Sequence, residues 1–529
     1  MSLRSLAAVF CFVGWSACGG VDDSLPAHEG AVCDGAGDCE GLEGTEGSAG
    51  DGTENVGTGD ESPQSDLDSG ESGPGFACPE ITPGSTVGVL NCSDGLEPGY
   101  TLFAPIRSTT TYLVDVGGRV VHSWESDHRP GLSVYLLEDG RLLRTINTSA
   151  ENNSLRGGGA AGGIEILDWD SSVLWRYSYN TDDYRSHHDV EYLPNGNILM
   201  LAWEKKTAEE VLARGRDTLL LPDGELWVDH ILELEPTGTE QATVVWEWHL
   251  WDHLVQEWDA NLEGFGSVAD HPELLDINFV WGDGGADWNH INSIDYHPEL
   301  DQIVMSSHHM SEIYIIDHST TSEEAAGHRG GMSGRGGDFL YRWGNPQVYQ
   351  RGTDAEQVLF LQHDARWIET DRPGAGQIMI FNNGSGRGGQ SYSSVDVIEP
   401  PIQADGSYAL SSDAAYGPAE LAWTYVGDGD DSFFSRNISG AHRLSNGNTL
   451  VCDGPAGAFR EVTPEGERVW DYVNPVVQGG IVAQGNPIPA NQRGQENTVF
   501  RATRYRADYP GFAGRTLIPG GTLESTGTR

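Results

Sequence analysis

The sequence predicts an all-β fold, a six-bladed β-propeller with four-stranded blades, and three observations support this fold class. From about residue 78 onward, short runs of alternating apolar and polar residues are separated by Gly, Asn, Asp and Pro. One strand pattern recurs along this part of the chain. The 529 residues include 70 Gly and 16 Trp, which favours many tight turns and large aromatic core side chains over helical bundles.

Each copy of the recurring pattern supplies about four short strands, with Asn-Gly or Asp-Gly tips that suit hairpins. Weaker copies lie around 101–147 and from 459 onward, and we expect the C-terminal segment to pair with the first blade and close the propeller. The four clear copies comprise 163–170, 173–177 and 188–201; 231–234, 244–248, 290–296 and 302–305; 312–317, 339–343, 363–368 and 377–381; and 395–398, 421–425, 442–448 and 449–452.

The first 18 residues are typical of an export signal of the lipoprotein type. Arg4 precedes the apolar run from Leu6 to Val13, and small residues precede Cys18, which would be lipidated after cleavage. The apolar run is shorter than a transmembrane helix requires. We therefore expect an exported protein, in the periplasm or attached to the outer membrane or cell surface through Cys18.

Residues 19–77 have the composition of a disordered acidic linker, with fifteen Asp or Glu and no Lys or Arg. Such a segment has too few large apolar side chains to offset the entropy lost on ordering. Two local disulfides are expected in an oxidising compartment, Cys33–Cys39 and Cys78–Cys92. The alternative use of these cysteines is a metal site, but no Cys-x-x-Cys spacing is present, and we expect no metal centre.

The formal net charge of −50 excludes a nucleic-acid partner, because neutralising phosphates requires a basic surface. A surface this acidic also repels anionic substrates. Any anion site must therefore be built locally from His, Arg and backbone N–H groups. The simplest role of the acidic excess is solubility, and the sequence does not predict the oligomeric state.

Histidines recur at one position of the repeat. Alignment of the predicted innermost strands places His188, Asn292, His363 and Ser439 at equivalent positions, and His290 lies two residues before Asn292, on the same side of its strand. The alternative is that His188-Asp189 and His363-Asp364 are turn-entry pairs with a structural role. Three histidines at one rim of a propeller channel favour a composite functional site.

Four separated segments resemble the bacterial arylsulfotransferases, in the same order along the chain and within about residues 100 to 480. They are HHDVEYLPNGNIL at 187–199, DWNHINSIDY at 287–296, QHDARW at 362–367 and SGAHRLSNGNTL at 439–450. This resemblance implies a six-bladed propeller enzyme that moves a sulfuryl group from a phenolic sulfate to another phenol. It also implies independence of a nucleotide sulfate donor, small phenols and aryl sulfates as partners, and no cofactor.

The resemblance assigns roles to individual residues. His363 matches the histidine that becomes transiently sulfated, and we expect its side chain to be exposed to substrate. His290 is the expected general acid, His188 a further catalytic channel histidine, and His187 a less favoured match for the same position. The substrate-binding residues implied by the resemblance and the repeat are Asn292, His187, His308, Ser439 and Arg436.

The sequence departs from the family pattern at His308, where the family places an arginine that helps to hold the sulfate. A protonated His308, or Arg436 or Arg366, is expected to replace that charge. The substitution also supports an alternative function, a propeller that has lost transferase activity and binds a ligand at the cell surface. A second alternative, a propeller oxidoreductase or lyase, has no quinone or flavin signature in its favour.

One segment interrupts the β pattern. Residues from Thr207 to Arg216 have helical spacing and helix-forming side chains. We expect them to form a short helix over the mouth of the channel.

Overall fold

The computed structural model describes residues 76–529, except 283, 390, 429–430, 493 and 526–529. The predicted signal at 1–18, the linker up to residue 75 and the pair Cys33–Cys39 lie outside the described residues and stay predictions. Contacts divide the chain into Met1–Ser69 and Gly70–Arg529, and all the described residues belong to the second unit.

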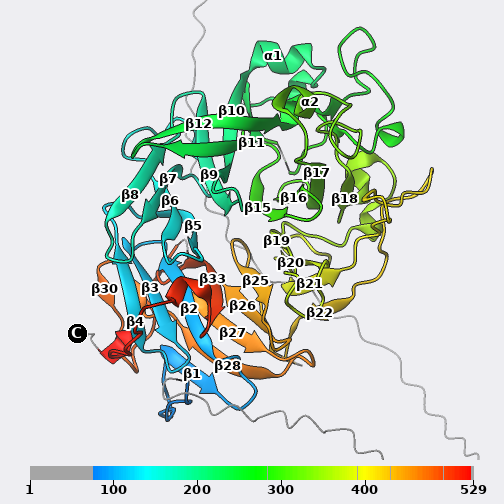
Figure 1. Ribbon diagram of the computed structural model, residues 1–529. Helices are drawn as coiled ribbons and strands as arrows, with labels where there is room; N and C mark the ends of the chain where they lie inside the picture. The colour runs from blue at the N-terminus through cyan, green and yellow to red at the C-terminus, as the bar shows by residue number, and fades with distance from the viewer. Residues whose placement is uncertain (1–75, 283, 390, 429–430, 493, 526–529) are drawn as a thin grey trace, which may run out of the picture. The chain divides into compact units, whose positions relative to one another are not determined.

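The described chain is an all-β structure of antiparallel meanders in a propeller-like arrangement (Figure 1). Three sheets have four strands, and one of them combines strands from both ends of the described chain. These sheets are β33 (Val499–Arg506), β2 (Gly99–Pro105), β3 (Thr110–Asp115) and β4 (Val120–Glu125); β15 (Ile291–His297), β16 (Gln302–Ser307), β17 (Glu312–Asp317) and β18 (Tyr341–Trp343); and β19 (His363–Trp367), β20 (Ile378–Asn382), β21 (Ser394–Ile398) and β22 (Trp423–Tyr425).

The largest sheet has eight strands and consists of two consecutive meanders. A single parallel pair, Leu132 with His188, joins their innermost strands β5 and β9. The first meander contains β5 (Pro130–Leu136), β6 (Leu142–Asn147), β7 (Gly162–Leu167) and β8 (Val173–Ser178), and the second contains β9 (Tyr184–Tyr192), β10 (Ile198–Thr207), β11 (Glu225–Thr237) and β12 (Gln241–His249).

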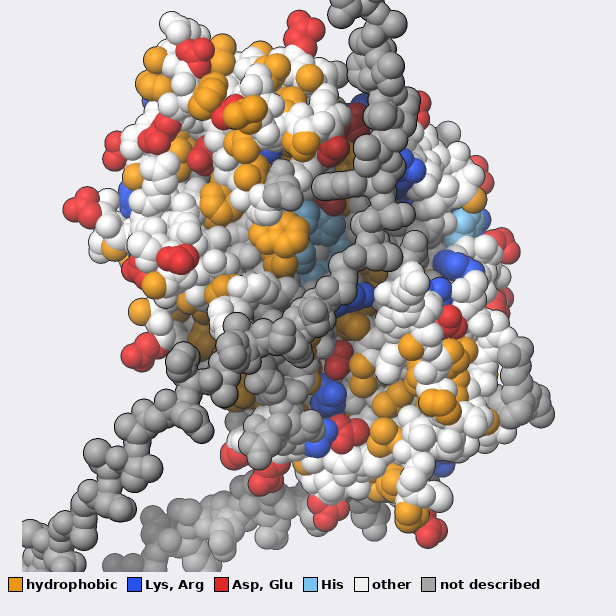
Figure 2. Space-filling view, turned by 180° about the vertical axis from the view of Figure 1, so that it is seen from behind, with side chains coloured by type: hydrophobic (Ala, Val, Ile, Leu, Met, Phe, Trp, Pro, Cys, Tyr) orange, Lys and Arg blue, Asp and Glu red, His pale blue; other side chains and the backbone are white. Residues whose placement is uncertain are grey.

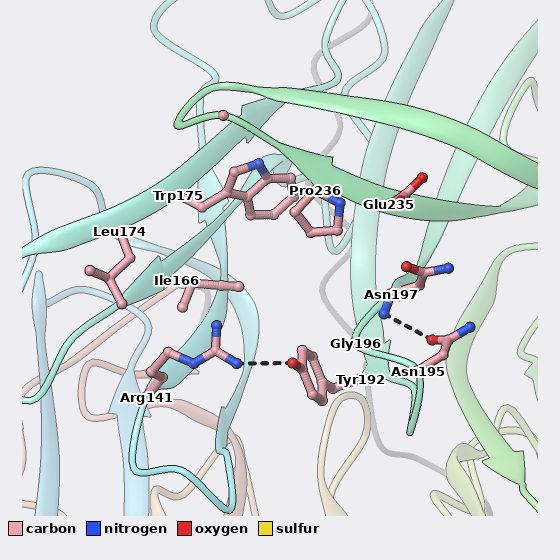
Figure 3. Close-up of a pocket in the computed structure, with 11 residues that line it drawn as sticks. Arg141, Ile166, Leu174, Trp175, Tyr192, Asn195, Gly196, Asn197, Glu235 and Pro236 are labelled. Atoms are coloured by element: carbon pink, nitrogen blue, oxygen red, sulfur yellow. Dashed lines mark hydrogen bonds between the residues drawn. The ribbon is translucent and has the colours of Figure 1, made fainter.

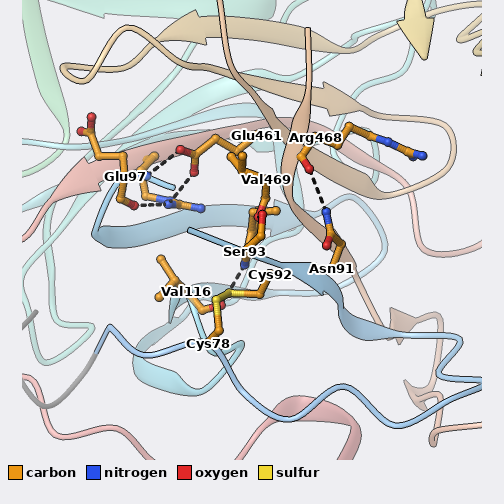
Figure 4. Close-up of a disulfide and its surroundings, with 11 residues drawn as sticks. Cys78, Asn91, Cys92, Ser93, Glu97, Val116, Glu461, Arg468 and Val469 are labelled. Atoms are coloured by element: carbon orange, nitrogen blue, oxygen red, sulfur yellow. Dashed lines mark hydrogen bonds and ion pairs between the residues drawn. A yellow bond between two sulfur atoms is a disulfide. The ribbon is translucent and has the colours of Figure 1, made fainter. Parts of the chain in front are cut away.

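The fifth large sheet carries the start of the described chain on its outer edge. Here β1 (Gly88–Cys92) pairs with β28, and the order continues inward to β25. The predicted disulfide Cys78–Cys92 is confirmed at the end of β1 (Figure 4). The other strands of this sheet are β25 (Gly440–Arg443), β26 (Thr449–Asp453), β27 (Ala458–Val462) and β28 (Arg468–Val473).

The C-terminal strand closes the arrangement, as the repeat pattern predicts. β33 pairs antiparallel with β2, with Tyr100 opposite Tyr505. Each innermost strand contacts the next in the cycle β33, β5, β9, β15, β19 and β25, and β25 returns to β33. Residues at the start of these strands therefore lie close together although they are far apart in sequence.

The acidic residues beside two predicted site histidines bind one innermost strand to the next. Asp189 Oδ2 accepts from the backbone N–H of Ile294 at 3.3 Å, and Asp364 Oδ2 accepts from that of Ala441 at 2.9 Å. Ser293, at the equivalent position of β15, accepts from the N–H of Ala365 at 3.0 Å. Asp189 and Asp364, which follow His188 and His363, therefore have a structural role.

Regular helix is confined to two short segments of the described chain, α1 (Ala208–Ala213) and α2 (Ser322–Ala325). The predicted helix α1 forms because Thr207 and Glu210 make a reciprocal capping box at its start. Its expected place over the channel is wrong: α1 packs on β10 and β11 at the outer edge of the molecule (Figure 1). Strand β10 pairs with β11 along its whole length and carries the helix outward.

Short two-stranded ribbons lie in the loops between the large sheets. Among the described residues, no helix is long and apolar enough to cross a membrane. The ribbon strands are β13 (Leu254–Val255) with β14 (Leu275–Asp276), β23 (Gly427–Asp428) with β24 (Asp431–Ser432), β29 (Val476–Val477) with β30 (Gly480–Ile481), and β31 (Ala490–Asn491) with β32 (Gly494–Gln495).

Candidate functional site

The predicted site histidines come together in one connected cluster. Their ring centroids follow one another at 4.8 Å from His188 to His290, 5.3 Å from His290 to His308 and 5.0 Å from His308 to His363. These residues come from β9, the start of β15, the turn after β16 and the start of β19. Figure 2 shows His side chains gathered in a hollow near the middle of one face, beside an apolar group.

Backbone irregularity concentrates where these histidines lie. His188 and His290 have φ values of 52° and 51°, and Asp364 has 54°, all in the left-handed region that residues other than glycine rarely adopt. The ladders of β9, β15 and β19 each shift register at this point. Such bulges redirect side chains out of the strand alternation, here toward the centre of the cluster.

His363 has both ring nitrogens engaged. Nδ1 lies 2.7 Å from the side-chain oxygen of Asn383, and Nε2 accepts from the backbone N–H of Ile438 at 3.2 Å. Burial lowers the pKa of His363 to about 3, so the ring is neutral at pH 7. The expectation of an exposed nucleophile is wrong for this structure, because the side chain is only 3% exposed. The segment that carries Ile438 covers Nε2.

His290 has the opposite electrostatic environment. Burial lowers its pKa, but the charge of Asp287 and a 2.7 Å hydrogen bond from Nδ1 to Oδ2 of Asp287 outweigh burial and raise it. His309 stacks on His290 with a centroid distance of 4.8 Å, and the half-exposed Trp281 stacks on His309. His290 therefore favours the protonated, proton-donating form.

His308 lies between His290 and His363, at the centre of the cluster. Burial and the neighbouring histidines lower its pKa well below the usual range, and no hydrogen bond from the described residues satisfies its Nδ1. A neutral His308 cannot supply the charge of the family arginine. Burial and the neighbouring histidines thus disfavour a protonated His308 as the replacement for this charge, and that expectation stays a prediction.

His187 lies behind His188 and away from solvent. The Nδ1 atoms of the two rings are 2.8 Å apart, so one of them carries the shared proton. His187 stacks on Trp203 with a centroid distance of 4.0 Å, and its Nε2 lies 2.7 Å from Asp229. Its side chain is fully buried, which suits a residue that positions His188.

Asn292 lies on the innermost strand β15, and Ser439 lies directly before the innermost strand β25. Their polar groups make hydrogen bonds that stabilise the fold. The amide nitrogen of Asn292 donates to the carbonyl of Gln362 at 2.8 Å, directly before His363. The hydroxyl of Ser439 accepts from the backbone N–H of Gly454 at 3.0 Å. Both side chains are fully buried. Asn292 Oδ1 has no hydrogen-bond partner among the described residues and so keeps unused accepting capacity.

Three arginines lie near the cluster in different settings. Arg501 of β33 binds Asp189 at 2.6 Å and Asp364 at 3.0 Å and is buried. Arg366 binds the same Asp364 at 2.9 Å. Arg436 is exposed, two residues before Ile438, on the segment that covers His363. Arg366 and Arg501 are thus compensated by buried carboxylates.

Sequence reasoning missed several residues of the site. Asp287 belongs to the recognised segment 287–296, and His309 directly follows His308, so their spacing to the predicted histidines was the available signal. Asn383, Trp281 and Arg501 come from other segments. They carry no signal in sequence, because only the folded chain brings them beside the histidines.

A separate surface hollow of about 380 Å³ lies between the two meanders of the eight-stranded sheet (Figure 3). Arg141 donates to the hydroxyl of Tyr192 at 2.9 Å across it, and Trp175 forms part of its wall. It contains none of the predicted site residues.

Comparison with known proteins supports the same family as the motifs. The family model for arylsulfotransferase (ASST) matches residues 170–486, more than half of the chain. No curated protein matches the sequence. Solved structures that match include a protein of unknown function from Bacteroides caccae (10% identity, 77% of this chain and 99% of that one, TM-score 0.40) and virginiamycin B lyase from Staphylococcus aureus (10% identity, 74% and 90%, TM-score 0.34). Because the family model spans all four histidine segments, the chain belongs to the arylsulfotransferase family.

Proposed function

We propose that this protein transfers a sulfuryl group from a phenolic sulfate ester to an acceptor phenol through a sulfohistidine on His363, without a nucleotide sulfate donor. Family membership supports aryl sulfotransferase activity in general. The finer mechanism rests on one geometric relationship: His290 and His363 lie on either side of His308, with Nδ1 of His290 held by a carboxylate and Nδ1 of His363 held by an amide, and their pKa values shift in opposite directions.

Opposite shifts are what a nucleophile and a general acid need. His363 is neutral at pH 7, and its Nδ1–H donates to Asn383, which leaves the lone pair on Nε2. His290, held by Asp287 through Nδ1, carries its transferable proton on Nε2.

In the first half-reaction, Nε2 of His363 attacks the sulfur of the aryl sulfate. The N–S bond forms as the S–O bond to the phenol breaks. The leaving oxygen keeps the electron pair and takes the Nε2 proton of His290. The charge on the sulfuryl oxygens is stabilised by hydrogen-bond donors placed around them, which include the backbone N–H of Ile438.

The second half-reaction reverses these steps with a new phenol. Neutral His290 removes the acceptor proton, the phenolate oxygen attacks sulfur, and the electron pair of the N–S bond returns to Nε2 of His363. The protein ends in its starting protonation state, as a transferase requires.

The aromatic part of donor and acceptor has a matching surface. Trp281 is 50% exposed and lies parallel to His309, with 5.0 Å between ring centroids and 14° between planes. We propose that phenols stack against this exposed indole, since offset aromatic pairs are favourable. When the sulfate enters, the backbone N–H of Ile438 must then shift its hydrogen bond from Nε2 to a sulfuryl oxygen.

The proposal includes the setting of the enzyme. Counting β5–β8 and β9–β12 as separate blades, each of four strands, gives a six-bladed propeller. The one parallel pair between these meanders supports that division. The signal-like residues 1–18 and the disulfide Cys78–Cys92 support export, with attachment to a membrane through Cys18.

The decisive experiment combines an assay with mass spectrometry. Purified protein receives a chromogenic aryl sulfate, with and without a phenol, and no nucleotide. We expect release that depends on the phenol and, without phenol, a sulfuryl adduct on the peptide containing His363. His363→Asn should lose both while keeping the circular dichroism of the wild type. Release into water alone would indicate a sulfatase, and an adduct elsewhere would overturn the assignment of His363.

A further inference from the structure

A second cluster of histidine and carboxylate lies outside the histidine cluster of the candidate site. Nδ1 of His253 and Nδ1 of His328 each lie 2.8 Å from the same oxygen, Oδ1 of Asp338. The three potential ligand atoms all lie within 4.8 Å of one another. His253 and Asp338 are buried, whereas His328 is exposed.

The hydrogen bonding of His253 leaves its Nδ1 facing a carboxylate oxygen while Nε2 is already engaged. Nε2 of His253 lies 2.8 Å from the carbonyl oxygen of Ala325, which can only accept, so Nε2 carries a proton. A neutral His253 then directs the lone pair of Nδ1 at a carboxylate oxygen. Two acceptors at 2.8 Å repel each other unless a proton or a metal ion lies between them.

The surroundings of His253 resemble those of a metal ligand. Metal-binding histidines commonly donate their second ring nitrogen to a carbonyl or carboxylate, as His253 does to Ala325. Trp248 lies parallel to the His253 ring, 5.6 Å away and inclined by 6°, and its indole N–H donates to the carbonyl of Gly337. The ring of His253 is therefore held in one orientation.

We propose that His253, His328 and Asp338 bind a divalent transition metal, with Zn²⁺ as the best match to two imidazoles and one carboxylate. Zinc sites with three protein ligands of this kind keep a fourth position for water. Tetrahedral ligand atoms about 2.0–2.1 Å from zinc are roughly 3.3 Å apart. The contacts of 2.8 Å need to open by about half an ångström, which the exposed His328 can provide.

The metal would stabilise the Gly-rich segment 327–337, which loses much conformational entropy when it becomes ordered. Residues 327–337 contain Gly at 327, 330, 331, 334, 336 and 337 and form no strand or helix. Glycine loses more conformational freedom on folding than any other residue. A metal bound between His253, which follows β12, and the two ends of this segment would close the loop and stabilise it.

This site has no sequence signature, and from the sequence alone we expect no metal centre. Its ligands are separated by 75 residues between His253 and His328 and by 10 residues between His328 and Asp338. Neither separation matches a short metal-binding motif. Only the fold brings the three side chains together.

The test is titration of chelator-treated full-length protein with Zn²⁺, followed by calorimetry, and with Co²⁺, followed by its visible absorption. We expect one equivalent to bind tightly and to raise the thermal unfolding midpoint. His328→Ala should weaken this binding by about a hundredfold or more, because one of three ligands is lost. Since His328 is exposed, the variant should fold.

Two controls make the result specific. His271→Ala removes another partly exposed histidine that pairs with a carboxylate, Glu273, and should leave binding unchanged. His309→Ala removes a member of the other His and Asp group, which contains Asp287 and His290, and should leave this equivalent in place. Absence of binding by the wild type, or unchanged binding by His328→Ala, would overturn the proposal in favour of a protonated His253 beside Asp338.

Discussion

The side-chain oxygen of Asn383 lies 2.7 Å from Nδ1 of His363, and this contact fixes which nitrogen of the histidine can react. The amide nitrogen of Asn383 donates to the carbonyls of Ser435 and Ile438, at 2.7 and 3.0 Å. Because that nitrogen is engaged with two acceptors, the amide oxygen faces His363 and receives its Nδ1–H. Asn383 thus positions His363, the proposed nucleophile, and also the segment that covers it.

Replacing Asn383 should disturb the tautomer of His363. We expect Asn383→Ala to lower kcat by about 10- to 100-fold, because the ring can then rotate and place its proton on Nε2. Nitrogen NMR of labelled histidine should show one neutral tautomer of His363 in the wild type and a mixture in the variant. Ser385→Ala is the matched control: it removes another contact to the same segment, at Arg436, without touching His363. A single unchanged tautomer in Asn383→Ala would contradict this role.

Asp287 should control the protonation of His290. Its charge raises the pKa of His290, so the wild type keeps this proposed general acid protonated to higher pH. In Asp287→Asn we expect the fall in kcat/KM with rising pH to begin at lower pH. At about pH 8, donors with poor leaving groups should react about a hundredfold more slowly, and activated donors should change less.

A control for Asp287 is available in the same region. Asp223 accepts from the backbone N–H of Ala286 and does not contact the histidines, so Asp223→Asn should keep the wild-type pH profile. Equal loss for good and poor leaving groups in Asp287→Asn would show that Asp287 serves only the fold.

Arg501 should be a strong determinant of stability. Its guanidinium compensates two buried carboxylates, Asp189 and Asp364, at the centre of the inner strands. Arg501→Met should lower the free energy of unfolding by about 3–5 kcal/mol, because the buried Asp189 loses its arginine partner and Asp364 is left with Arg366. Urea unfolding can measure this. Arg506→Met, which breaks an exposed pair on the same strand, should cost less than about 1 kcal/mol.

Acid should destabilise the protein through its buried neutral histidines. Burial lowers the pKa of His230 to about 3, while the unfolded chain keeps about 6.5. Between these values the unfolded state binds more protons, so stability is full above about pH 6.5 and is lost as the pH falls toward about 3. One such group contributes up to about 1.4 kcal/mol per pH unit.

The contribution of His230 can be isolated by substitution. We expect His230→Gln to reduce the slope of unfolding free energy against pH between about 6.5 and 4.5, whereas His271→Gln, at an exposed position, should leave it unchanged. Urea titrations at several pH values measure the slope. An identical slope in His230→Gln and the wild type would contradict the assignment.

The sequence by itself determined the class of fold, the family and the convergence of the central histidines. Alternating strands with Gly-rich turns specify β meanders because side-chain period and turn chemistry are local properties. Repeat alignment places His188 and His363 at equivalent positions of two innermost strands, β9 and β19, so their convergence follows from the repeat. The pair Cys78–Cys92 is likewise local and is confirmed.

Only the tertiary structure decided the electrostatics and the partners. His290 and His363 have the same intrinsic chemistry, but Asp287 raises one pKa and burial lowers the other. Asn383 and Arg501 come from distant strands, and no local pattern marks them. A pKa depends on burial and on charges within a few ångströms, and these are set when remote segments pack together.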